Sequence, residues 1–224
     1  IKSHFIRYAT DFINPYLDGY FEKYNLITTP IEEDFFTNGI LSKKLWHIHY
    51  KDSLVKPWKE YIFYNRPGVI IPSFNGNTSI YTGKPDITYN SYNKRGRNTS
   101  LHTRMGQSVV LVWGYKHQHI IAQISNATIA EVENKGIDIE ALADKEEPTE
   151  TDWDLLHSLR EALPQGRIII TRYEPLIGII SQTGPTGVTV RYTYDEFGRL
   201  SETIETGKRE NVIQKNEYKY ATEK

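Results

Sequence analysis

The chain has 224 residues, enough for one large domain or two small ones with a hydrophobic core. Its 27 Lys and Arg residues nearly balance 28 Asp and Glu residues, so charge does not indicate a nucleic-acid-binding surface. Cysteine is absent, which excludes disulfides, thiolate nucleophiles and cysteine-based zinc sites. The 16 tyrosines, many of which alternate with polar residues, favour half-buried strands.

The sequence starts at Ile1 without an initiator Met or a signal-peptide pattern, and no apolar run is long enough to span a membrane. We therefore expect a segment of a longer polypeptide, or a processed terminus, that does not insert into a membrane. Residues 1–27 form a predicted helical lead-in. Aromatic residues three and four positions apart predict a short helix from about Pro15 to Tyr24, because proline is tolerated in a first helical turn.

Residues 28–126 show a period of two, which predicts strands. Glycine-containing dipeptides such as Asn38-Gly39, Pro67-Gly68 and Arg95-Gly96 separate the alternating segments and indicate turns. The clearest predicted strands cover residues 45–50, 59–64, 87–92, 109–113 and 120–124.

Residues 127–164 are predicted to be a helical insertion between strands. Asn126 or Thr128 is expected to cap the first helix. A clearer helix is predicted from Asp152 to Leu163, with Thr151 or Asp152 as its cap and Pro164 after its end. Its apolar residues share one face that should point inward: Trp153, Leu156, Leu159 and Leu163.

Residues 165–224 return to a strand pattern, first at 168–171 and 177–180. The remainder predicts one long hairpin, in which Val188–Leu200 and Val212–Tyr220 pair antiparallel or present a long edge. Tyr192 and Tyr194 would then share one face, and Tyr218 and Tyr220 would share another. The predicted fold class is therefore a β-dominated α+β fold of antiparallel hairpins, with a helical insertion and a short N-terminal helix.

Four segments have an aromatic residue followed four positions later by glycine: Phe35–Gly39, Tyr64–Gly68, Tyr92–Gly96 and Tyr194–Gly198. In three of them the residue after the aromatic is Asn or Asp, whose side chain can bond the backbone of a turn. Glycine adopts a positive φ without a Cβ penalty. We therefore expect these glycines at hairpin tips.

The segment Tyr194-Asp195-Glu196-Phe197-Gly198-Arg199-Leu200 strongly resembles the YD repeat of the RHS-repeat family. Residues 89–96 resemble a second, degenerate copy, and weaker similarity to large bacterial YD-repeat proteins extends from about residue 28 to residue 220. The tract 115–119, with His117 and His119, departs from that pattern. The expected repeat-motif residues are Tyr64, Gly68, Tyr92, Gly96, Arg97, Tyr192, Tyr194, Asp195, Gly198 and Arg199.

The resemblance implies a non-catalytic structural or interaction segment of a bacterial cell-envelope or secreted protein. Its partner would be the remainder of the parent polypeptide or another envelope protein. In well-understood members of the family, the repeats build a β-sheet shell around a C-terminal toxin. A part of such a casing is therefore one alternative, and a carbohydrate- or surface-binding module that uses exposed aromatic residues is another.

The sequence gives weaker indications of metal binding and of nucleic-acid binding. His47 and His49, and likewise His117 and His119, are two apart and would share a strand face as metal ligands do, but a metal site needs further ligands. The basic run from Lys94 to Arg104 comes with a net charge of −1 and no nucleic-acid-binding motif. We therefore predict no metal, no cofactor, no nucleic-acid partner and no enzymatic site.

Overall fold

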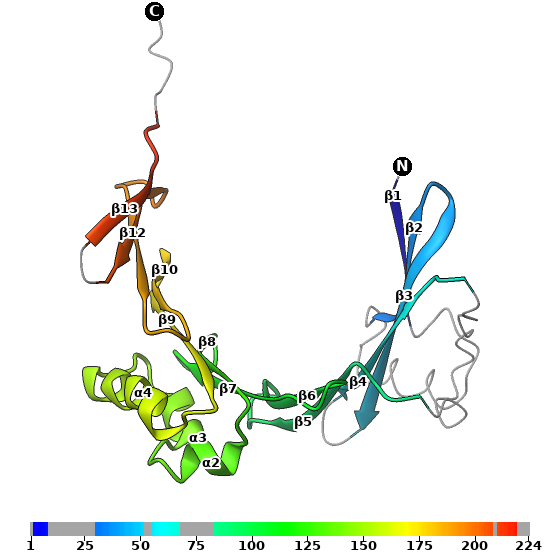
Figure 1. The fold of residues 1–224 in the computed structure, drawn as a ribbon, viewed down its shortest axis with the longest axis horizontal. Coiled ribbons are helices and arrows are strands. Elements are labelled where there is room, and N and C mark those ends of the chain that lie inside the picture. Colours follow the sequence, from blue (N-terminus) through cyan, green and yellow to red (C-terminus); the bar gives the residue numbers. More distant parts are fainter. Residues whose placement is uncertain (1, 9–29, 52–54, 68–82, 208–209, 219–224) are drawn as a thin grey trace, which may run out of the picture. The chain divides into compact units, whose positions relative to one another are not determined.

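The computed structural model describes residues 2–8, 30–51, 55–67, 83–207 and 210–218 (Figure 1). The helices in this part of the chain are α2 (Ile129–Glu133), α3 (Ile139–Asp144) and α4 (Glu150–Ala162). The predicted helix Pro15–Tyr24 lies outside the described residues. The strands, in chain order, are β1 Lys2–Tyr8, β2 Pro30–Thr37, β3 Ile40–Lys51, β4 Val55–Tyr64, β5 Ile87–Tyr92, β6 Asn98–Thr103, β7 Ser108–Gly114, β8 His119–Ser125, β9 Arg167–Glu174, β10 Gly178–Thr183, β11 Thr189–Tyr194, β12 Leu200–Thr206 and β13 Glu210–Lys215.

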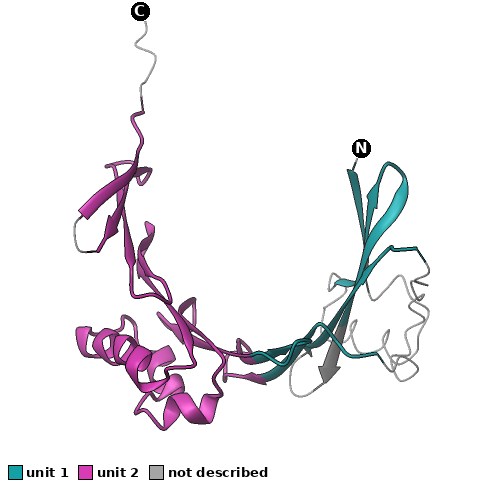
Figure 2. Ribbon diagram, in the orientation of Figure 1, with its two compact units in different colours: residues 1–90, 101–107 teal, residues 91–100, 108–224 magenta. Residues whose placement is uncertain are grey.

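The order of the strands in the sheet is their order in the chain, from β1 to β13. Pairing is antiparallel, as between β2 and β3 or β7 and β8. The β-dominated fold predicted from the sequence is therefore confirmed. The chain divides into two compact units, residues 1–90 with 101–107 and residues 91–100 with 108–224 (Figure 2). No described helix is long and apolar enough to cross a bilayer.

In the first unit, one face of β2–β4 is buried and carries both charged and aromatic side chains. Lys44 is 8% exposed, and its Nζ lies 2.8 Å from Glu32 Oε1 and 2.9 Å from Asp34 Oδ1. Trp46 Nε1 donates a 2.7 Å hydrogen bond to Glu32 Oε2. The Trp46 ring packs edge-on against Phe63 with the centroids 4.7 Å apart. This buried face therefore contains an ammonium group that is bound between two carboxylates.

In the second unit, α2–α4 cover one face of β7–β9 (Figure 1). Thr128, one of the two residues predicted to cap this helix, is the N-cap of α2 and forms a capping box with Glu131. For α4 the predicted caps Thr151 and Asp152 were wrong, because the helix begins at Glu150 and Thr149 is its N-cap. Thr149 Oγ1 accepts a hydrogen bond from the Asp152 backbone N–H, and the Asp152 carboxylate accepts one from the Thr149 N–H.

The core of this unit joins the helices to the sheet. Leu156 and Leu159 are fully buried, and Trp153 and Leu163 are 3% exposed, so the inward face predicted for α4 is confirmed. These side chains pack in one cluster with residues of all three strands, among them Val110, Val112, Ile121, Ile124, Ile168 and Ile170. Val110 and Val112, two residues apart on β7, share the face that packs against the helices.

The C-terminal region corrects the prediction of a single long hairpin. Val188–Leu200 and Val212–Tyr220 do not pair with each other, because β12 lies between β11 and β13 and pairs with both. Tyr192 and Tyr194 lie in β11 as expected. Tyr218 follows β13 outside any strand, and its hydroxyl donates a 3.0 Å hydrogen bond to Leu200 O. Tyr220 lies outside the described residues.

Candidate functional site

The turn after Tyr92 is built around Asn93, which is 7% exposed. The Asn93 N–H donates to Arg97 O at 2.9 Å, and the Gly96 N–H donates to Asn93 O at 2.9 Å. The Asn93 side-chain Oδ1 accepts from the backbone N–H groups of Arg95 and Arg97, both at 3.0 Å. Gly96 has a φ of +73°, so the turn closes on the conformation that favours glycine.

The turn after Tyr194 repeats this geometry around Asp195. The Asp195 N–H donates to Arg199 O and the Gly198 N–H to Asp195 O, both at 2.9 Å. Asp195 Oδ1 accepts from the Phe197 N–H at 2.9 Å and from the Arg199 N–H at 3.0 Å. Gly198 has a φ of +72°. The two turns therefore share one hydrogen-bond pattern, although their sequences agree only at the tyrosine, the glycine and the arginine.

The two turns differ in what the other polar side-chain atom of their first residue contacts, Oδ2 in Asp195 and Nδ2 in Asn93. Asp195 Oδ2 accepts from Arg199 Nε at 2.8 Å and from Arg199 Nη2 at 2.6 Å. The hydrogen bond from Arg199 is the main reason that the pKa of Asp195 lies below its ordinary value. Asn93 Nδ2 instead donates to His117 Nδ1 at 2.8 Å. Asn93 thus links the first turn to a distant part of the chain, whereas these bonds of Asp195 lie within its own turn.

The remaining predicted motif residues lie on or beside strands. Tyr194 donates a 2.6 Å hydrogen bond to Ile179 O on the neighbouring strand, and Tyr192 is half-buried. The Arg97 guanidinium stands 5.5 Å from the centroid of Trp113. Tyr64 is the last residue of β4 and is 50% exposed. Positive φ is confirmed at Gly39, Gly96 and Gly198, while Gly68 lies outside the described residues.

Replacing Gly198 with alanine is expected to cost about 1–2 kcal/mol of unfolding free energy, because an L-residue must adopt the left-handed conformation there. A Cβ at Gly198 would meet nothing within 4 Å, so the cost is that of the backbone alone. Gly207→Ala is the matched control, since its Cβ also meets nothing and its φ is not left-handed. Urea unfolding of both variants tests this, and equal stabilities would contradict it.

His117 lies in a strained turn rather than on a strand, so the prediction that His117 and His119 share one strand face was wrong. Tyr115, Lys116 and His117 have φ values of +52°, +56° and +64°, a conformation that costs non-glycine residues energy. Hydrogen bonds to the end of α3 hold the turn: Lys116 N–H to Lys145 O at 2.9 Å and His117 N–H to Ala143 O at 3.0 Å.

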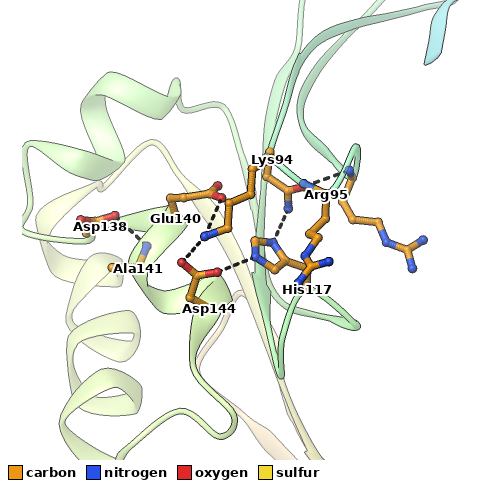
Figure 3. Close-up of polar contacts among 9 residues, drawn as sticks. Lys94, Arg95, His117, Asp138, Glu140, Ala141 and Asp144 are labelled. Atoms are coloured by element: carbon orange, nitrogen blue, oxygen red, sulfur yellow. Dashed lines mark hydrogen bonds and ion pairs between the residues drawn. The ribbon is translucent and has the colours of Figure 1, made fainter. Parts of the chain in front are cut away.

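Around His117, which is 3% exposed, polar groups converge from the first turn and from α3 (Figure 3). His117 Nε2 lies 2.9 Å from Asp144 Oδ1, and Lys94 donates a hydrogen bond to Asp144 Oδ2. Lys94 Nζ also lies 3.9 Å from Glu140 Oε1. The hydrogen bond from Lys94, followed by that from His117, holds the pKa of Asp144 below its ordinary value. The ligand atoms of His117, Glu140 and Asp144 lie within 4.8 Å of one another, a grouping that the sequence did not reveal.

In the first unit, His47 is held between carboxylates of both neighbouring strands. Its Nε2 lies 2.6 Å from Glu33 Oε1 and its Nδ1 lies 3.5 Å from Glu60 Oε1. His4 binds the other oxygen of Glu33 at 2.7 Å, and the Tyr89 hydroxyl donates to Glu60 at 2.8 Å. Burial alone would lower the pKa of His47, but the hydrogen bonds and charges of Glu60 and Glu33 outweigh it, and the pKa is raised above 6.5.

Because its folded-state pKa is raised, His47 should stabilise the first unit fully below about pH 6.5 and progressively less as pH rises through the folded value. We therefore expect the stability difference between the parent chain and His47→Gln to be larger at about pH 5.5 than at about pH 8.5. Urea midpoints of both proteins at the two pH values measure it. A difference that stays constant or grows with pH would contradict the assignment.

Aromatic side chains mostly pack against other parts of the chain. Trp46 and Trp153 are 4% and 3% exposed. The His119 ring stacks on Tyr173 at 4.3 Å between centroids, and Tyr115 meets Tyr173 edge-on at 6.0 Å. These last three rings line a hollow of about 260 Å³, but their contacts are with each other. These three rings therefore pack against one another instead of forming a flat exposed platform.

Residues 178–210, from β10 to the start of β13, match the RHS Repeat family model. No curated protein matches the sequence. Among solved structures, similarity is found to the crystal structures of TcdB2-TccC3-TEV (15% identity, TM-score 0.44) and TcdB2-TccC3-Cdc42 (14%, 0.43). The Tc holotoxin pore of Photorhabdus luminescens is similar at 14% identity and a TM-score of 0.43. The alignments cover 82%, 90% and 92% of this chain, but only 8%, 10% and 10% of the respective chains.

Proposed function

We propose that this chain, in which residues 178–210 form an RHS repeat, is a structural segment that contributes hairpins to the sheet of a larger exported bacterial protein. The shared turn around Asn93 and Asp195 supports a repeated structural unit, because the same hydrogen bonds recur in two places. In this proposal Tyr92, Gly96, Tyr194 and Gly198 are repeat-motif residues that build turns, and none of them acts on a substrate.

The exposed strand β13 is the observation that carries the proposal. All six of its residues are exposed, and Val212 and Ile213 are 55% and 53% exposed. Within the described residues its only pairing partner is β12. A single repeat unit cannot bury such a strand alone, whereas a following hairpin would cover it. The partner that best fits β13 is therefore a further strand of the same polypeptide.

Hydrogen–deuterium exchange tests this function directly. Amides of β13 should exchange at least about tenfold more slowly in the longer polypeptide than in the 224-residue chain, because a new strand would bond them. Amides of β8, which pairs on both sides already, are the internal control. Equal exchange of β13 in the two proteins would contradict the proposal.

The narrower role, part of a casing around a toxin, rests on the same repeat and requires an enclosed cargo. Limited proteolysis of the longer protein tests it, since a cargo domain inside a casing should be cleaved only after the casing unfolds. Cleavage of all domains at equal rates would favour an open structural segment instead. Under either role the chain itself is proposed to have no catalytic activity.

A further inference from the structure

The orientation of the Asn93 amide is fixed by its own turn. Oδ1 accepts two backbone N–H groups, from Arg95 and Arg97, and only an oxygen can do so. The amide nitrogen must therefore be the atom 2.8 Å from His117 Nδ1. Because an amide NH₂ group donates and does not accept, His117 Nδ1 must be the acceptor and must carry no proton.

This requirement fixes the opposite side of the imidazole. A neutral ring without a proton on Nδ1 carries it on Nε2, which then donates to Asp144 Oδ1 at 2.9 Å. The other oxygen of Asp144 accepts from Lys94, the neighbour of Asn93 in the same turn. Every hydrogen bond in the series Asn93–His117–Asp144–Lys94 therefore pairs a donor with an acceptor, and the series starts and ends in the same turn. The His117 side chain is 2% exposed, so water has little access to the ring.

We propose that Asn93 sets the tautomer of His117 and thereby makes Asn93, Lys94, His117 and Asp144 a latch that fastens the β5–β6 turn to α3. The same tautomer closes the neighbouring cluster of His117, Glu140 and Asp144 to metal ions. Histidine binds a metal through an unprotonated nitrogen, and here Nε2 carries the proton. Moving that proton to Nδ1 would set an N–H against the Asn93 NH₂ group. The Lys94 ammonium supplies the positive charge that the two carboxylates attract.

The turn around Asp195 indicates which substitution would change the hydrogen bond between residue 93 and His117. Because Asp195 makes the same two backbone hydrogen bonds as Asn93, an aspartate at position 93 is compatible with the turn. In Asn93→Asp the atom facing His117 becomes an acceptor. With a carboxylate then on each side, as at His47, the ring should take up a second proton and donate from Nδ1 as well as from Nε2.

Nitrogen-15 histidine labelling and long-range proton–nitrogen spectra report the tautomer, at a pH where the ring is neutral. His117→Gln identifies the signal among the seven histidines. At a pH where the parent ring is neutral, the parent chain should show His117 protonated on Nε2 alone, and Asn93→Asp should show it protonated on both nitrogens. An Nδ1-protonated ring in the parent would overturn the proposal without reference to any variant. An unchanged tautomer in a folded Asn93→Asp protein would overturn the role of Asn93.

A Co²⁺ titration followed by absorbance tests the closure to metal. The parent chain and His117→Gln should bind Co²⁺ with the same low affinity, because a histidine whose Nε2 is protonated offers no ligand atom to the cluster. Binding of Co²⁺ by the parent chain that is at least about tenfold tighter than by His117→Gln would overturn the inference that the tautomer excludes metal.

Discussion

Replacing Lys44 with methionine is expected to lower the unfolding free energy of the first unit by about 3–5 kcal/mol, the usual cost of removing one partner from a buried ion group. Methionine keeps the apolar length of the side chain but removes the ammonium that lies within 2.9 Å of Glu32 and Asp34. Those carboxylates are 1% and 4% exposed, so water cannot take over the role of Lys44.

Lys43→Met is the matched control, because Lys43 precedes Lys44 on β3 and points to the opposite face, where its Nζ lies 5.0 Å from the Phe35 ring. Its loss should cost no more than about 1 kcal/mol. Exchange of the β3 amides under native conditions measures both variants. Similar protection in the two would show that the buried ammonium contributes little to stability.

Leu156→Ala should destabilise the second unit by about 2–5 kcal/mol, since it removes a fully buried side chain and leaves a cavity between α4 and the sheet. The same chemical change at Leu176, which lies fully exposed in the β9–β10 turn, should alter stability by less than about 0.5 kcal/mol. Urea unfolding followed by exchange of the α4 amides distinguishes the two. Equal losses would mean that α4 does not depend on this packing.

Features set by neighbouring residues were predictable from the sequence. The spacing of Trp153, Leu156 and Leu159 defined the buried face of α4, because a helix brings residues three and four apart together. The glycine positions defined three turn tips. The start of α4 was misplaced by two residues because Thr149, Thr151 and Asp152 are all good caps, and the structure uses Asp152 as the acid of the capping box.

Features set by distant residues were not predictable. The latch joins positions 93, 117 and 144, and its geometry depends on three consecutive left-handed residues that no sequence pattern announces. The prediction of one long C-terminal hairpin was wrong for a different reason. Alternation looks the same in one long strand and in two short ones, so the period did not separate β11 from β12, between which the chain reverses.

The order of the strands has a consequence for how the protein acquires its structure during synthesis. Since each strand pairs with its neighbours in sequence, a hairpin can close soon after its second strand leaves the ribosome, without waiting for the C-terminus. The longest connection is between β8 and β9, which pair, as at Ala122 and Ile170, across the whole helical insertion. Growth of the sheet must pause there until α2, α3 and α4 have been made, so vectorial folding is delayed at this step.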